Sequence, residues 1–374
     1  MAGRGRGPGG LGAGLGLIAG VAALAAGGVA MGLELEKRIV ANRLVTHELA
    51  DTQEPEAAFF SVRSEGPDVT TVDGVVLHTE VDEVAPWAEA GSPLPDDLTI
   101  VFVHGYALSL DCWHFQRLHF RGRAKIVLYD QRSHGRSGRS APEHCRLADL
   151  AADLVQVLDE VVGAGRVVLV GHSMGGMTIM RLARTHPELF GERVVGVALI
   201  STAGGEMVDY SPIKGLPGRV FGRIAQPLMT TLNRVPELVE RSRKAGSDLG
   251  YVVTQRMSFG SEVPVTSVEF MSEMLGQTPL QVVSDFYPAF AELDEKEGFG
   301  ALTGVPVEVI GGRDDMITPV RHTEKLIELM PTADGNVLDH TGHMSMIEHP
   351  HTVNALLDQL VDRSVAEPSA EQPS

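Results

Sequence analysis

The sequence predicts an α/β fold in which helices cover both faces of a mostly parallel central sheet. Short, unbroken apolar runs alternate with segments whose apolar residues recur at helical spacing. Strands of a parallel sheet are buried on both faces, and this is why they read as continuous apolar runs. A long interval, residues 204–300, contains no such run and instead has several helix-like stretches. The alternation therefore indicates one sheet with an insertion.

The individual elements can be assigned in chain order. Residues 68–83 are expected to form a hairpin that turns at Asp73 and Gly74, since Asp-Gly favours a tight turn. Helices are predicted where apolar residues recur every three or four positions. The expected strands are 98–105, 125–132, 166–173, 193–202, 305–312 and a last one near 335–340, and the expected helices are 147–162, 174–187 and 320–331.

These elements divide the chain into parts. Residues 60–203 and 301–363 form the expected α/β core, and residues 204–300 an inserted helical cap, because so long a connection is rarely plain loop. Methionines in the cap either fill its own core or line a site for an apolar ligand. They are Met207, Met229, Met257, Met271 and Met274. Residues 364–374 are polar and Pro-containing, which predicts a disordered tail.

The first 35 residues form a separate hydrophobic segment. No charged side chain occurs over residues 7–33, a stretch long enough to cross a membrane, and Arg4 and Arg6 precede it. We expect a signal sequence or membrane anchor, with the alternative of a soluble Gly/Ala-rich tail. The protein is thus expected to be membrane-anchored or exported, and otherwise cytoplasmic.

Composition excludes some functions. The formal net charge of −18 over 374 residues argues against nucleic-acid binding, because no basic face could dominate that field. The two cysteines, Cys112 and Cys145, lack the spacing of zinc ligands. We expect no metal and no cofactor.

The sequence "VVLVGHSMGGM" carries the main chemical signal. A β-branched run ends in a Gly-x-Ser-x-Gly pentad and a helical pattern follows, the context in which a serine is exposed on a tight strand-to-helix turn. Ser173 is therefore the candidate nucleophile, with Gly171 and Gly175 relieving crowding around it. His172 is expected to point away from Ser173 and to have a structural role.

A serine nucleophile needs a base, and the base needs an acid to orient it. His343 lies in a loop between the last strand and a helix, while His340 lies near that strand and His349 within the helix. The candidate acid is Asp315, which follows the strand at 305–312. Its alternatives are Asp314 and, more remotely, Glu206.

Two backbone N–H groups are candidates for the oxyanion hole. One belongs to Met174, directly after the nucleophile, and the other to Tyr106, in the "HGY" loop after the strand at 98–105. Acyl transfer needs such donors because negative charge develops on the attacked carbonyl oxygen.

Together with these candidate site residues, the segment 62–362 resembles the α/β-hydrolase superfamily with a helical cap. The motifs that carry the resemblance are "VFVHGY", "YDQRSHGRSG", "VGHSMGGM", "GGRDDMITP" and "TGHMSMIEHP", all in the family's order. The resemblance implies an eight-stranded sheet, a triad of Ser173, Asp315 and His343, and a structural role for Asp130 and Arg132. A serine at 173 counts against epoxide hydrolases and haloalkane dehalogenases, which use an aspartate there.

The function expected from these residues is a serine hydrolase that cleaves carboxylic esters, with apolar acyl or lipid esters as the favoured substrates. The alternatives are a cofactor-free perhydrolase or haloperoxidase, a carbon–carbon hydrolase or an acyltransferase with the same triad. A non-catalytic, membrane-associated binding protein is a remote alternative, against which the complete Ser, Asp and His set argues.

Overall fold

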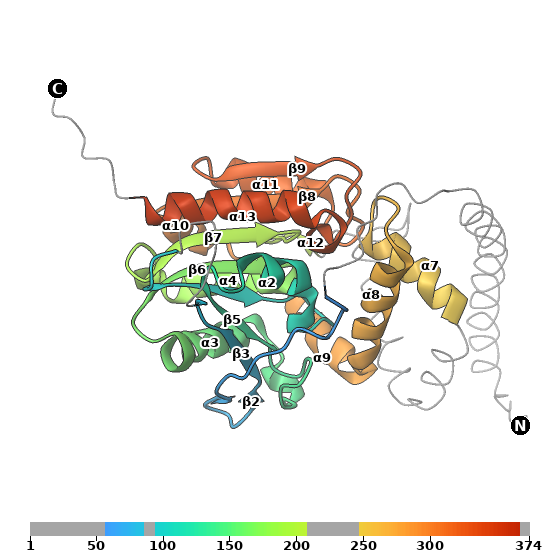
Figure 1. The fold of residues 1–374 in the computed structure, drawn as a ribbon, viewed down its shortest axis with the longest axis horizontal. Helices are drawn as coiled ribbons and strands as arrows, with labels where there is room; N and C mark the ends of the chain where they lie inside the picture. The colour runs from blue at the N-terminus through green and yellow to red at the C-terminus, as the bar shows by residue number, and fades with distance from the viewer. Residues whose placement is uncertain (1–56, 86–93, 208–246, 367–374) are drawn as a thin grey trace, which may run out of the picture.

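The computed structural model describes residues 57–85, 94–207 and 247–366 (Figure 1). The predicted signal or anchor segment, residues 1–35, lies outside them, as do residues 208–246 of the predicted cap and most of the predicted tail. Within the described ranges, no helix combines the length and the apolarity needed to cross a membrane.

A seven-stranded sheet in the order β3-β5-β4-β6-β7-β8-β9 forms the centre of the molecule. Only β3, at one edge, runs antiparallel to its neighbour, and the other pairs are parallel. The strands are β3 Thr79–Asp82, β4 Leu98–Val103, β5 Lys125–Tyr129, β6 Arg166–His172, β7 Val194–Ile200, β8 Val307–Gly312 and β9 Asp334–Leu338. The predicted parallel α/β fold is correct, but the described residues form seven strands of this sheet where the resemblance implied eight.

Helices cover both faces of the sheet, and alternate residues of each central strand pack on opposite sides. In β4, Val101 and Val103 belong to one core and Ile100 and Phe102 to the other. The first core includes α3 Leu147–Val157, α4 Met174–Thr185 and α11 Val320–Leu329. The second includes α2 His114–Phe120, α12 Ser345–Glu348 and α13 Pro350–Val365. Shorter turns are η1 Leu110–Trp113, η2 Pro142–His144, the π-turn η3 Leu158–Val162 and η4 Pro187–Leu189.

The predicted hairpin over 68–83 is correct only in its first part. β1 Val69–Thr70 and β2 Val76–Leu77 pair antiparallel around the turn, where Gly74 has a φ of +85°. The ladder then ends, because the His78 N–H donates to Ser137 Oγ at 2.9 Å. β3 follows and joins the edge of the main sheet through β5.

Helices also occupy the described part of the long interval between β7 and β8. They are α7 Ser247–Ser258, α8 Val265–Gln277, α9 Leu280–Ala291, η6 Lys296–Gly298 and α10 Phe299–Leu302. α7 and α8 lie beyond the carboxyl ends of the parallel strands (Figure 1). Met271 and Met274 are buried among apolar side chains, which supports a packing role for these two methionines.

Candidate active site

Ser173 lies on a sharp turn between β6 and α4. Its backbone is in the left-handed region, with φ 51° and ψ −115°, a conformation that costs energy for any residue other than glycine. The flanking glycines allow the turn: a Cβ at Gly175 would lie 2.0 Å from the Val103 carbonyl oxygen, and one at Gly171 would lie 2.7 Å from Gly175. The pentad therefore forms the strained strand-to-helix turn that its sequence predicted.

Asp315 and His343 meet through a buried hydrogen bond. His343 Nδ1 is 2.9 Å from Asp315 Oδ2, and both side chains are almost fully buried. An Nδ1 that faces a carboxylate carries the proton, which leaves Nε2 free to accept one. The imidazole thus has the tautomer that a general base requires.

The loop that carries Asp315 also orients its carboxylate. Oδ1 accepts hydrogen bonds from the Ile317 N–H at 2.7 Å and the Thr318 N–H at 2.9 Å. The Thr318 hydroxyl lies 2.8 Å from Oδ2 and 2.9 Å from the Ser201 carbonyl, at the end of β7. The loop after β8 is therefore tied to its neighbouring strand.

His172 joins the serine turn to the loop of His343. Its Nε2 donates to the His343 carbonyl at 3.0 Å, and the two rings are 4.7 Å apart. Burial and the neighbouring His343 hold the pKa of His172 well below its ordinary value, so the ring is neutral. Its role is structural, as expected, and consists of supporting the backbone that carries His343.

The alternative residues lie in other environments. Asp314, next to the buried Asp315, is exposed. His340 is exposed on a turn after β9 with a φ of 53°. His349 lies between α12 and α13. Glu206 has a largely exposed side chain whose Oε1 is 3.7 Å from Lys296 Nζ. The geometry therefore favours Asp315 and His343 as partners.

The two candidate oxyanion donors come from adjoining segments. A Cβ at Gly105 would approach His172 Nδ1 to 2.6 Å, and one at Gly175 would approach the His104 carbonyl to 2.8 Å, so the "HGY" loop packs on the serine turn. Met174 is the first residue of α4, where an N–H has no acceptor inside the helix. Among the described residues, neither this N–H nor that of Tyr106 donates to a backbone acceptor.

Asp130 and Arg132 hold the loop after β5, as the resemblance implied. The Asp130 carboxylate accepts from the N–H groups of Leu110 at 2.7 Å and Arg136 at 2.8 Å. Burial raises the pKa of Asp130 to about 6. Arg132 forms a bidentate pair with the buried Asp153, both contacts at 2.6 Å.

Sequence reasoning missed Gln131, which connects this loop to the site. Its N–H donates to His104 Nε2 at 2.9 Å, and its side-chain amide donates to the His104 carbonyl at 2.6 Å. Its Oε1 accepts from the Thr178 hydroxyl in α4 at 3.1 Å. Nothing in the local pattern singles out a glutamine for this role.

Glu348 was also missed, although it lies inside the "TGHMSMIEHP" motif. Its carboxylate accepts from the Gly342 N–H at 2.7 Å, just before His343. It also accepts from the Gly260 N–H at 3.0 Å and the Ser261 hydroxyl at 2.6 Å, in the connection between α7 and α8. One side chain therefore ties the His343 loop to the inserted helices.

The part of the chain that the structure describes contains no group of three or more His, Cys, Asp or Glu side chains placed to hold a metal ion. The chemistry that the Ser173 turn and the Asp315–His343 pair support is proton transfer and nucleophilic attack by side chains.

Residues 100–356 match the model of the alpha/beta hydrolase family. The chain belongs to this family. The seven described strands and the helices on both faces of the sheet agree with this membership.

Curated relatives carry different activities. A non-heme chloroperoxidase of Streptomyces lividans is 30% identical over 267 residues, which are 69% of this chain and 90% of the relative. A bifunctional esterase/perhydrolase of Acinetobacter calcoaceticus is 29% identical over 277 residues, 73% of this chain and 91% of the relative. The acetyltransferase component of an acetoin cleaving system of Pseudomonas putida is 27% identical, and the match spans 71% of this chain but only 62% of that relative.

Solved structures share the fold at lower identity. A thermophilic esterase from Thermogutta terrifontis superposes with a TM-score of 0.60 at 20% identity, covering 81% of this chain and 100% of the esterase. The likeness establishes the fold, and family membership makes the protein an α/β hydrolase.

Proposed function

We propose that this hydrolase cleaves carboxylic esters through a triad of Ser173, His343 and Asp315. The observation that carries the proposal is the buried 2.9 Å hydrogen bond between Asp315 and His343, on a loop that His172 joins to the strained turn of Ser173. A strained turn, an oriented imidazole and a buried carboxylate together are the parts of an acyl-transfer site.

In the proposed mechanism, Ser173 Oγ attacks the ester carbonyl while His343 Nε2 takes its proton. The N–H groups of Met174 and Tyr106 stabilise the oxyanion. His343 then gives the proton to the leaving alcohol, and water, activated by the same nitrogen, cleaves the acyl-enzyme. Asp315 stays ionised and stabilises the imidazolium.

We further propose that the helices between β7 and β8 form a cap that shapes the acyl pocket. The Tyr106 side chain supports this placement, because its hydroxyl donates to the Val283 carbonyl and its ring packs 4.9 Å from Phe290, both in α9. The Thr278 hydroxyl likewise donates to the Ala107 carbonyl at 3.1 Å. These contacts support a cap that borders the candidate oxyanion loop, and we propose apolar acyl groups as the substrates because ligand pockets are mostly apolar.

Perhydrolase chemistry is the second candidate. In that reaction hydrogen peroxide replaces water as the acceptor of the acyl group and a peracid leaves. The names of two relatives, a non-heme chloroperoxidase and an esterase/perhydrolase, favour this candidate over the other uses of the triad.

Turnover of p-nitrophenyl esters of graded acyl length tests the proposal, with peracid formation from acetate and peroxide measured alongside. We expect ester turnover that depends on acyl length and is lost in Ser173→Ala. A folded protein that forms peracid but does not hydrolyse any ester would favour the second candidate. Failure of both reactions would contradict the proposed triad chemistry.

A further inference from the structure

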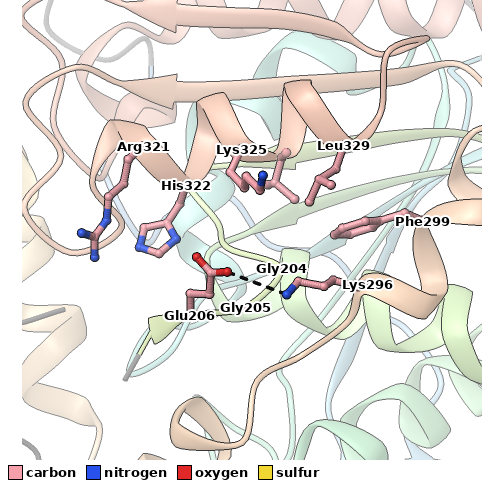
Figure 2. Close-up of a pocket in the computed structure, with 10 residues that line it drawn as sticks. Gly204, Gly205, Glu206, Lys296, Phe299, Arg321, His322, Lys325 and Leu329 are labelled. Atoms are coloured by element: carbon pink, nitrogen blue, oxygen red, sulfur yellow. Dashed lines mark ion pairs between the residues drawn. The ribbon is translucent and has the colours of Figure 1, made fainter. Parts of the chain in front are cut away.

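A cavity of about 300 Å³ lies between α11 and the segments that follow β7 and precede α10 (Figure 2). It is large enough for roughly ten groups the size of a water molecule, since each takes up about 30 Å³. Ser173, Asp315 and His343 are not among the residues that line it. The proposed ester site therefore does not account for this cavity.

Cationic side chains gather at one end of the cavity. Lys325 projects from α11 and Lys296 from the opposite side, and Glu206 contributes a carboxylate to the lining (Figure 2). Lys296 Nζ is 3.7 Å from Glu206 Oε1, longer than a hydrogen bond. Lys325 Nζ pairs with Glu328 at 2.9 Å, and because both side chains are largely exposed the pair has little energetic value. In a chain of net charge −18, this end of the cavity suits an anion.

A buried ring nitrogen at the same end has no hydrogen-bond partner. His322 is only 6% exposed and its Nε2 has no hydrogen-bond partner among the described residues, although the ring faces into the cavity (Figure 2). Burial and the neighbouring Arg321 lower the pKa of His322. A buried polar nitrogen without a partner is unfavourable, so a ligand oxygen that accepts a hydrogen bond from a protonated Nε2 would remove this penalty.

The other end of the cavity is apolar. Phe299 and Leu329 lie there (Figure 2), and Leu326 also belongs to the lining. Gly204 forms part of the wall, where a Cβ would come within 2.6 Å of the Phe299 ring and 3.2 Å of Leu326. Glycine at position 204 thus leaves room for Phe299 and Leu326 to pack directly against the backbone.

We propose that this cavity is a binding site for a small organic carboxylate with a short apolar tail. The carboxylate accepts from His322 Nε2 and faces Lys325 and Lys296, and the tail lies against Phe299 and Leu329. None of the three triad residues lines the site.

Calorimetric titration of the full chain with hexanoate tests this proposal, with hexanol as the neutral comparator. We expect saturable binding of hexanoate and at least tenfold weaker binding of hexanol. Lys325→Gln and His322→Phe should each weaken hexanoate binding at least fivefold. The matched control is Lys125→Gln, which removes the same charge from β5, where Lys125 pairs with Glu83 at 4.0 Å, and it should bind hexanoate like the unmodified protein.

The midpoint of thermal unfolding, measured for each variant, separates loss of the site from loss of the fold. Binding of hexanoate as a product at Ser173 would be insensitive to Lys325→Gln. Unchanged affinity in folded Lys325→Gln, equal affinity for hexanol, or no saturable binding would each overturn the proposal, whatever the outcome of the ester assays.

Discussion

At the scale of single residues, the site depends on which of two adjacent aspartates is buried. Asp315 accepts hydrogen bonds from its own loop and meets His343, while Asp314 is exposed and its N–H donates to the Thr341 carbonyl. Two adjacent aspartates therefore differ in environment: the Asp315 carboxylate contacts His343, while Asp314 is exposed to solvent.

Substitution of the two aspartates tests this distinction. Asp315→Asn should lower kcat for ester hydrolysis by roughly 10³- to 10⁴-fold, because an amide no longer selects the tautomer with a free Nε2. Asp314→Asn, the matched control, should stay within about twofold of the unmodified protein. Steady-state kinetics with a p-nitrophenyl ester measures both, and the reverse order of effects would transfer the role to Asp314.

The sequence singled out the candidate catalytic residues but not the residues that support them. Ser173, Asp315 and His343 could be selected because each follows a strand at the carboxyl edge of a parallel sheet. Gln131 and Glu348 could not, since their roles arise from contacts between segments far apart in the chain. Such contacts leave no periodic pattern in the local sequence.

At the scale of elements, unbroken apolar runs located the buried strands well. β4, β6 and β8 lie within the predicted ranges, because a strand covered on both faces must be apolar along its length. The prediction failed at β3, because the Asp73-Gly74 turn signal was taken to join all of residues 68–83 into one hairpin. Its partner is β5, more than forty residues away, and pairing at that distance has no turn signal.

The close packing of α4 on β4 gives a prediction for Gly175. Gly175→Ala should lower the free energy of unfolding by about 3 kcal/mol, because its Cβ would lie 2.0 Å from the Val103 carbonyl oxygen. The matched control is Gly300→Ala in α10, where the added Cβ meets nothing within 4 Å. It should be neutral, or stabilising by up to about 1 kcal/mol.

Urea unfolding of both variants, followed by circular dichroism, provides the comparison. Equal free energies of unfolding for the two variants would contradict the packing of the serine turn on β4.

At the scale of the whole molecule, buried histidines make stability depend on pH. Burial lowers the pKa of His104 to about 4 and of His134 to about 3, and that of His172 falls well below its ordinary value. Asp130 and Asp153 act in the opposite sense, since burial raises their pKa values to about 6.

The direction in which stability changes with pH depends on whether the folded or the unfolded chain binds more protons. Below pH 6.5 the unfolded chain protonates these histidines and the folded chain does not, so their contribution to stability is lost as pH falls. The two carboxyls give the opposite slope between about pH 4 and 6, because the folded state there binds protons that the unfolded state has released. Burial also lowers the pKa of His114 and of His322, and it raises the pKa of Glu308. With five such histidines against three carboxyls among the described residues, stability should decrease from pH 7 to pH 5.

His134→Phe isolates one contribution. It should reduce the slope of unfolding free energy against pH by about 1.4 kcal/mol per pH unit between pH 5 and 6, the effect of one proton. Urea unfolding at several pH values measures the slope. An unchanged slope in a folded variant would show that His134 does not resist protonation in the native state.

The central claim, that Ser173 is a nucleophile activated by His343 and Asp315, is tested most directly by labelling with a fluorophosphonate probe. We expect one probe per chain, found by mass spectrometry on the peptide that contains Ser173, with labelling abolished in Ser173→Ala and strongly slowed in His343→Ala. A folded protein that stays unlabelled, or labelling that persists in Ser173→Ala, would contradict the account.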